Sequence, residues 1–166
     1  PVWALPNKSA LTDSTGQELF NTAIGLEADS NYAQAEANYK SVIEQYPATG
    51  CAAASLSHLF RLSDYVFNNL QTYKLYFLSD TVIINHPHLK RIGQWLANRC
   101  DIALGNYQQA ELWLDSIVQN PASASDSLYA LIDLAQVLTL YDTSALKQAV
   151  YLNSESSMPK DQAGFR

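Results

Sequence analysis

Two stretches of this chain share one spacing of apolar residues and one proline terminator. The first, residues 31–47, reads NYAQAEANYKSVIEQYP, and the second, residues 105–121, reads GNYQQAELWLDSIVQNP. In both, apolar side chains recur at i, i+3, i+7, i+10 and i+11, which places them on one face of an α-helix. Proline then ends each helix, because it lacks the amide N–H and disfavours helical geometry in the preceding residue. A motif that recurs together with its terminator indicates a helical repeat architecture.

The apolar positions of the two stretches correspond one to one. In each, the second position is an alanine, Ala35 or Ala110, whose small side chain allows a neighbouring helix to approach closely. We therefore expect both faces to be buried in a helical core. The positions concerned are Tyr32, Ala35, Tyr39, Val42 and Ile43 in the first stretch, and Tyr107, Ala110, Leu114, Ile117 and Val118 in the second.

The order of these residues resembles the second helix of a tetratricopeptide repeat, in which Tyr-x-x-Ala is followed by an aromatic residue or leucine, an aliphatic residue and proline. Gly105–Asn106 is similar to the tight turn that joins the two helices of such a repeat. The match covers these two stretches, and the other repeats are degenerate. The overall pattern also resembles helical regions of large secreted bacterial proteins that end in a C-terminal sorting tail.

The resemblance implies an all-α fold in which antiparallel helix pairs stack as a short right-handed solenoid with one concave face. A single pair cannot bury its apolar faces alone, so neighbouring pairs must stack. A closed helical bundle is the alternative fold. Residues 1–11 are expected to form an extended lead-in, because Pro6 precludes a helix through them. The helical repeat domain is expected over residues 12–152, and a polar tail or linker over residues 153–166.

Polar caps set the helix boundaries that we expect in the first part of the chain. Thr12 or Asp13 is expected to cap the first helix, and Asp64 a later one. Residues 81–84, TVII, are largely β-branched and could be extended. We expect them to be helical, because no other segment of the chain offers a strand partner.

A long helix is expected after the second motif. Ser123 or Ser125 is expected to cap it, and a turn at residues 142–144 separates it from a short final helix. Its broad apolar face is expected to be buried. That face consists of Leu128, Leu131, Ile132, Ala135, Leu138 and Leu140.

The composition narrows the possible function classes. Of the 166 residues, 48% are hydrophobic and 16% are charged, and the charged share is below the roughly 25% of an ordinary globular domain. The formal net charge of −6 argues against binding to nucleic-acid phosphates or to an anionic membrane surface. Apolar runs fall far short of the ~20 residues that a transmembrane helix needs.

The start of the chain bears on localisation. Its first residues, PVWALPNKSALTDS, lack the basic and apolar regions of a secretory signal, and the first residue is proline rather than methionine. We interpret the chain as a fragment or a processed product, so the missing signal leaves the compartment open. A secreted or cell-surface location is favoured over a cytoplasmic one.

The chain offers little for catalysis or metal binding. It has no glycine-rich phosphate loop, no HExxH and no CxxC motif. His86 and His88 flank a proline, but two ligands do not make a metal site, and the sequence does not place His58 beside them. Cys51 and Cys100 are interpreted as small buried apolar side chains, because two cysteines are too few for a disulfide scaffold. We expect no enzymatic activity, no metal and no cofactor.

One exposed stripe is the candidate binding site. Arg91, Trp95 and Arg99 recur at i, i+4 and i+8 on a predicted helix over residues 89–104. The family resemblance implies that such a helix lines the concave groove, and Arg and Trp are the residues most enriched at interface hot spots. The arginines would suit a carboxylate of the partner. The alternative is that Trp95 packs at the edge of the core with an arginine stacked on it.

Together these features predict a non-catalytic protein–protein interaction or scaffold module that binds a peptide or protein partner on its concave face. The alternative is a structural spacer domain within a larger exported or cell-surface protein, whose surfaces contact neighbouring domains of the same polypeptide. An accessible stripe would favour the first function, and a stripe buried by packing would favour the second. A deep pocket that holds a histidine beside a carboxylate would instead favour an enzyme.

Overall fold

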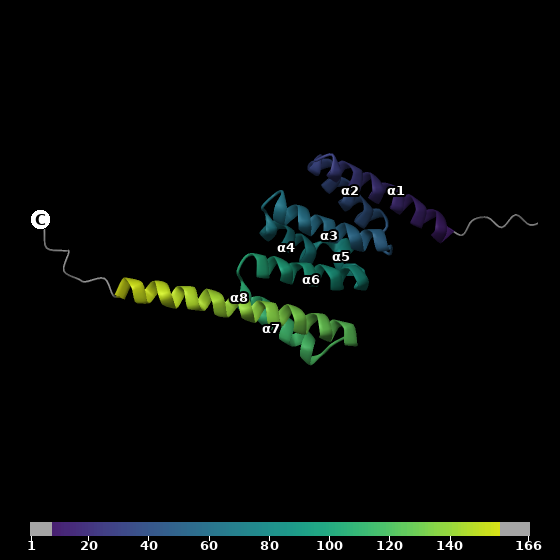
Figure 1. Cartoon of the computed structure of the whole chain (residues 1–166). Helices are drawn as coiled ribbons and strands as arrows, with labels where there is room; N and C mark the ends of the chain where they lie inside the picture. Colours follow the sequence, from purple (N-terminus) through teal and green to yellow (C-terminus); the bar gives the residue numbers. More distant parts are fainter. Residues whose placement is uncertain (1–7, 157–166) are drawn as a thin grey trace, which may run out of the picture. The chain divides into compact units, whose positions relative to one another are not determined.

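The computed structural model describes the backbone of residues 8–156 and the side chains of residues 16–123 and 126–142. Every regular element in this range is a helix, which confirms the all-α prediction (Figure 1). The helices are α1 (Lys8–Ala28), α2 (Tyr32–Gln45), α3 (Gly50–Tyr65), α4 (Leu70–Ser79), α5 (Thr81–Asn85), α6 (Pro87–Ala103), α7 (Tyr107–Gln119) and α8 (Ala124–Ser156).

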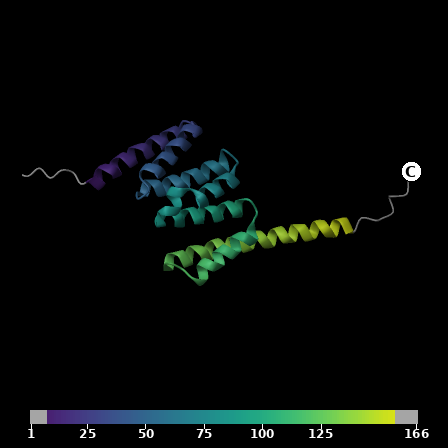
Figure 2. The ribbon, with the colours of Figure 1, turned by 180° about the vertical axis from the view of Figure 1, so that it is seen from behind.

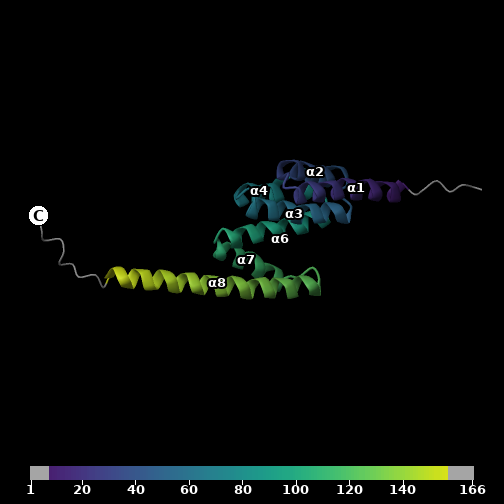
Figure 3. The same ribbon diagram turned by 45° about the horizontal axis from the view of Figure 1, so that its top comes forward.

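The chain divides into two compact units, one that ends at Leu104 and one that begins at Gly105. In the first unit, α1 packs against α2 and α3, and α3 packs against α2, α4 and α6. α3 lies between α1 and α6 in Figures 1, 2 and 3. Each of these helices therefore contacts helices that come shortly before or after it in the chain.

The core of the first unit is built on the apolar face of α2. Ala35, Tyr39, Val42 and Ile43 are fully buried, as the spacing predicted, whereas Tyr32 is only half-buried. Leucines of α3 and aromatic residues of α4 complete this core. Its largest fully buried side chains are Tyr39, Phe77, Ile43, Leu56, Leu59, Leu62, Ile83 and Leu89.

The backbone of α6 comes unusually close to α4 at Gly93. A Cβ atom added to this glycine would lie 2.7 Å from the carbonyl oxygen of Phe77 and 3.0 Å from a methyl group of Ile83. Both distances are shorter than ordinary van der Waals contact, and a backbone carbonyl has little freedom to move away. Glycine at this position therefore permits the close approach of the two helices.

Several expected helix boundaries in this unit differ from the observed ones. α1 begins at Lys8 rather than after Thr12 or Asp13, so residues 8–11 of the expected lead-in are helical, and residues 1–7 lie outside the described residues. Asp64 does not cap α4, because it lies inside α3. Asn68 has a φ of 49°, in the left-handed region that asparagine tolerates but that interrupts a right-handed helix. The next helix, α4, therefore begins only at Leu70.

Two other local predictions are confirmed. Residues 81–84 are helical as part of α5, and the carboxylate of Asp80 caps that helix by accepting the N–H groups of Val82 and Ile83 at 3.0 and 3.1 Å. Gly105, which follows α6, has a φ of 79°, a conformation that glycine adopts without steric cost.

The second unit pairs α7 with α8. Ala110 and Leu114 of α7 are fully buried, as predicted, and the hydroxyl oxygen of Ser123 caps α8 by accepting the N–H of Asp126 at 3.2 Å. The other apolar positions of the motif in this unit are half-buried. They are Tyr107, Ile117 and Val118.

Two predictions about α8 are wrong. No turn interrupts the helix at residues 142–144; it continues to Ser156, because Asp, Thr and Ser disfavour a helix only weakly and no glycine or proline follows before its end. The helix also buries a different face from the expected one: Ala130 and Val137 are fully buried. The expected face is exposed, and it comprises Leu128, Leu131, Ile132, Ala135, Leu138 and Leu140.

The tail expected at residues 153–166 falls mostly outside the described residues, and its first part, residues 153–156, belongs to α8. Across residues 8–156, each helix lacks either the length or the apolar character that crossing a membrane would require.

Candidate functional site

The candidate site lies where α1 and α3 run side by side in the first unit. The thiol of Cys51 donates a hydrogen bond to Oε1 of Gln17 at 3.3 Å, and Arg61 donates one to Oε1 of Glu27. The two partners are 34 residues apart in both contacts. Because this separation is the same at two places along the helices, α1 and α3 run in the same direction and in a fixed register.

Four side chains from three helices form what we call the polar node: Glu27 of α1, Tyr39 of α2, and His58 and Arg61 of α3. Tyr39 donates its hydroxyl hydrogen to Oε2 of Glu27 at 2.7 Å, and Nδ1 of His58 lies 2.8 Å from the same oxygen. Nδ1 is also 2.9 Å from the Tyr39 hydroxyl and 3.1 Å from Nη2 of Arg61. A hydrogen on Nδ1 fits this arrangement, because a carboxylate can only accept.

The hydrogen bonds of the polar node keep the carboxyl group of Glu27 ionised. Burial raises the pKa of Glu27, but hydrogen bonds from Tyr39, His58 and Arg61 outweigh burial and bring that pKa below its usual value. Burial, together with the neighbouring carboxylate, raises the pKa of Tyr39 far above its usual range. At neutral pH, Glu27 is therefore an anion that accepts hydrogen bonds, and Tyr39 is a neutral donor.

Aromatic rings hold His58 in place on two sides. Its ring stacks on Tyr39 with 4.8 Å between centroids, and the ring of Phe20 meets it edge-on at 5.5 Å. In the described part of the chain, the hydrogen bonds of Nδ1 of His58 join it to Glu27 and Tyr39, and no serine, threonine or cysteine shares them. A histidine beside a carboxylate is thus present, but it forms a brace between helices and is not among the residues that line the pocket between α1 and the start of α3.

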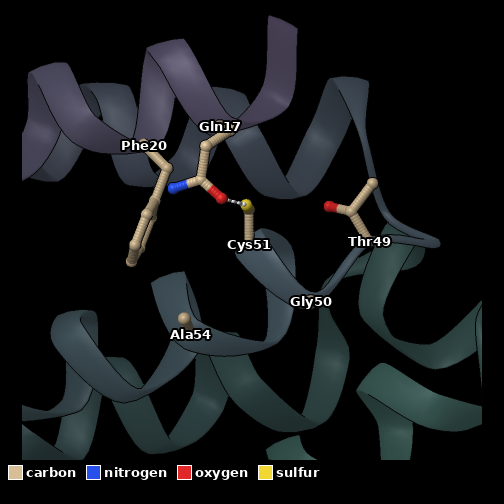
Figure 4. Close-up of a pocket in the computed structure, with 6 residues that line it drawn as sticks. All are labelled: Gln17, Phe20, Thr49, Gly50, Cys51 and Ala54. Atoms are coloured by element: carbon tan, nitrogen blue, oxygen red, sulfur yellow. Dashed lines mark hydrogen bonds between the residues drawn. The ribbon is translucent and has the colours of Figure 1, made fainter. Parts of the chain in front are cut away.

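A pocket of about 400 Å³ opens between α1 and the start of α3. Figure 4 shows Gln17 and Phe20 descending from α1 toward Cys51 and Ala54 of α3. Thr49 and Gly50, at the N-terminal end of α3, complete the lining. Phe20 belongs to both features, because its ring lines the pocket and also contacts His58 of the polar node.

The hydrogen-bonding groups of the pocket already have partners. Gln17 accepts from the Cys51 thiol and donates through Nε2 to Asn21 at 2.9 Å. Thr49 caps α3: its hydroxyl accepts the N–H of Ala52 at 3.3 Å and donates to the carbonyl of Tyr46 at 2.7 Å. The pocket therefore presents a surface without charged side chains, and its polar side chains already have hydrogen-bond partners.

The predicted binding stripe lies on α6. Arg91 and Arg99 are exposed, Trp95 is half-buried, and none of the three lines the pocket between α1 and α3. Half-burial of Trp95 agrees both with a binding surface and with packing at the edge of the core. The role of the stripe therefore stays a prediction.

The candidate metal and thiol residues lie apart from one another. Nδ1 of His86 donates to the carbonyl of Val82 at 2.8 Å, and no group of three or more His, Cys, Asp or Glu within the described residues could hold a metal ion. Cys51 and Cys100 are free thiols, but only Cys100 is fully buried, whereas Cys51 is half-buried at the pocket. Burial raises the pKa of Cys100 to about 12.

Sequence reasoning missed both the polar node and the pocket. It considered His58 only as a metal ligand, and it gave no role to Glu27 or Arg61. Gln17 with Cys51 and Glu27 with Arg61 are each 34 residues apart, a spacing that the two motif stretches do not show, because Ala35 and Ala110 are 75 residues apart.

Comparisons with known proteins do not place this chain in a family: no family model matches it, and no curated protein or solved structure matches it either.

Proposed function

We propose that this chain is a non-catalytic interaction or scaffold module, built as a short TPR-like right-handed solenoid. In the first unit, the exposed face of α1 and α3 forms part of a concave surface that binds a peptide or protein partner. The stripe of Arg91, Trp95 and Arg99 on α6 supplies anchoring residues for the same kind of partner.

The observation that carries this proposal is the equal separation of the two α1–α3 contacts. Both join residues 34 apart, and 34 residues is the length of a tetratricopeptide repeat. The main packing partners of α1 are α2 and α3, as expected for the first helix of an open stack. A closed bundle would also bring α1 against α6.

A non-catalytic role is supported by how the polar node uses its groups. The hydroxyl of Tyr39 is fully buried with its residue, and Glu27 accepts hydrogen bonds from Tyr39, His58 and Arg61. A general base needs a free position within hydrogen-bonding reach of a substrate proton. These groups instead satisfy one another and join three helices, which suits a rigid binding scaffold.

Peptide selection tests this function. A display library of short random peptides is panned on the immobilised full chain, and selected peptides are titrated against wild type, Arg99→Glu, Trp95→Ala and Lys90→Glu. Lys90 is exposed on the same helix, so Lys90→Glu makes the same charge reversal away from the stripe. We expect binding by wild type and Lys90→Glu, loss with Arg99→Glu and Trp95→Ala, and unchanged helicity in all four.

Two results would count against the proposal in different ways. A library that yields no peptide above the blank surface would remove the binding function. Equal binding by all four proteins would remove the stripe from the site and leave the α1–α3 face as the candidate.

A second candidate function is a structural spacer within a larger exported or cell-surface protein. The apolar residues exposed on α8 favour it, because single-chain proteins rarely leave a contiguous apolar face uncovered. Leu128 is 58% exposed and Ile132 is 56% exposed. Fractionation of source cells with an antibody to this domain distinguishes the two: a surface band much larger than these 166 residues supports the spacer, and an interior band of this size supports the free-standing module.

A further inference from the structure

The pocket between α1 and α3 offers no side-chain counter-charge. Its lining residues are Gln17, Phe20, Thr49, Gly50, Cys51 and Ala54, and none of them is Asp, Glu, Lys, Arg or His. The side chains of Gln17, Thr49 and Cys51 already form hydrogen bonds with each other or with neighbouring residues. A charged side chain that entered would give up part of its hydration without gaining an ion pair, which is unfavourable.

The volume of the pocket and the Phe20 side chain in its wall favour an aromatic ring as the bound group. A cavity of roughly 150 Å³ is enough to hold benzene, and this pocket measures about 400 Å³. Phe20 supplies an aromatic wall that is already fixed, because Tyr39 and His58 contact its ring at centroid distances of 5.8 and 5.5 Å. An incoming ring would pair with Phe20 without first ordering it.

We propose that this pocket binds an uncharged aromatic side chain of the peptide partner and anchors that peptide on the α1–α3 face. This inference rests on the proposed function, since it names the residue class that the module recognises. Shape and ring contact with Phe20 set the selectivity, and the lining offers Asp, Glu, Lys and Arg no counter-charge at this position.

Cys51 allows the pocket to be tested in the native chain. Its thiol lines the pocket and is half-buried, whereas Cys100 is fully buried with a pKa raised to about 12, so it reacts far more slowly. The folded protein is equilibrated with cysteamine disulfides that carry phenylethyl, cyclohexylethyl or carboxyethyl tails, under a fixed concentration of 2-mercaptoethanol. Intact mass then gives the fraction captured, and Cys51→Ser shows the background.

We expect about tenfold stronger capture of the phenylethyl tail than of the carboxyethyl tail, with the cyclohexylethyl tail between them. Ala54→Phe places a ring inside the pocket and should abolish the preference. Ser57→Phe is the matched control, because Ser57 is exposed on the same helix and does not line the pocket. Equal capture of the three tails by wild type, or an unchanged preference in Ala54→Phe, would overturn the inference.

The selected peptides separate this inference from the function on which it rests. Peptides that bind with an aromatic residue and slow the reaction of Cys51 with a thiol reagent support both. Peptides that bind without protecting Cys51 overturn the pocket assignment and leave the binding function in place. A phenylethyl preference with no binding peptide overturns the function and leaves the chemistry of the pocket in place.

Discussion

Replacing Glu27 by glutamine removes the charge at the centre of the polar node while it keeps the shape of the side chain. The side chain of Glu27 is only 13% exposed, and donors from Tyr39, His58 and Arg61 converge on its two oxygens. A glutamine amide has one accepting oxygen and one NH2 group. Whichever way the amide is turned, its NH2 group faces at least one of these donors, so a hydrogen bond is lost.

The size of the effect follows from the exposure of each donor. A buried hydrogen bond to a charged group is worth about 1.5–3 kcal/mol, which applies to the one from the fully buried Tyr39. The side chain of Arg61 is 54% exposed, so its ion pair contributes at most about 1 kcal/mol. We therefore expect Glu27→Gln to lower the free energy of unfolding by about 2–4 kcal/mol.

Urea unfolding followed by circular dichroism measures this loss, with Glu18→Gln as the control on the same helix. Glu18 is exposed, so its substitution should change stability by less than about 0.5 kcal/mol. Adding Tyr39→Phe in a double-mutant cycle isolates the Tyr39–Glu27 bond, for which we expect a coupling of about 1.5–3 kcal/mol. If Glu27→Gln lowered the free energy of unfolding no more than Glu18→Gln does, the polar node would not stabilise the contact between the three helices.

Three further predictions concern the first unit. Gly93→Ala should lower stability by roughly 1–3 kcal/mol in thermal melts, because its Cβ would lie 2.7 Å from a backbone carbonyl oxygen in α4; an unchanged melting temperature would contradict the close approach. Ala35→Glu should unfold the unit locally, because it buries a charge at a fully buried position, and a melt identical to that of wild type would contradict the repeat interpretation of α2. The pKa of Glu27 is lowered from 4.5 by folding, so its stabilisation is complete above that pH and is lost as the pH falls through the folded value. Below about pH 4.5, the free energy of unfolding of wild type should therefore fall more steeply with decreasing pH than that of Glu27→Gln. Equal slopes for the two proteins would exclude Glu27 as a source of acid sensitivity.

Local pattern was sufficient to predict the helices that carry the motif. Tyr39 and Val42 are buried because the helical period places them on the apolar face of α2, and the proline after them sets only where that helix ends. The helical state of residues 81–84 was also predicted, because no other segment of the chain offers a strand partner, and the structure adds a helix cap from the Asp80 carboxylate. These features depend on residues close together in the sequence.

Features that depend on packing between helices were not predicted. In α8, hydropathy favoured burial of Leu128 and Ile132, but the face toward α7 is the one that contains Ala130 and Val137. Small and β-branched side chains allow close contact with α7, and hydropathy alone does not register this preference. The pocket and the polar node likewise require the register of α1 against α3, which no single helix specifies.

An ion pair and a cation–π contact also join helices of the first unit. Nζ of Lys74 in α4 lies 2.6 Å from Oδ1 of Asp101 in α6, and both side chains are largely buried. The ammonium group of Lys40 in α2 lies 5.3 Å from the ring centroids of both Tyr73 and Tyr76 in α4.

The register of α1 against α3 is the measurement that tests the repeat stack most directly. Nuclear Overhauser effects between assigned side chains of the isotope-labelled full chain report which residues of the two helices are adjacent. The account predicts contacts from Gln17 to Cys51 and from Glu27 to Arg61, with the same 34-residue separation at both ends. Contacts from Gln17 to Arg61 and from Glu27 to Cys51, or extensive contacts between α1 and α6, would contradict it and favour a closed bundle.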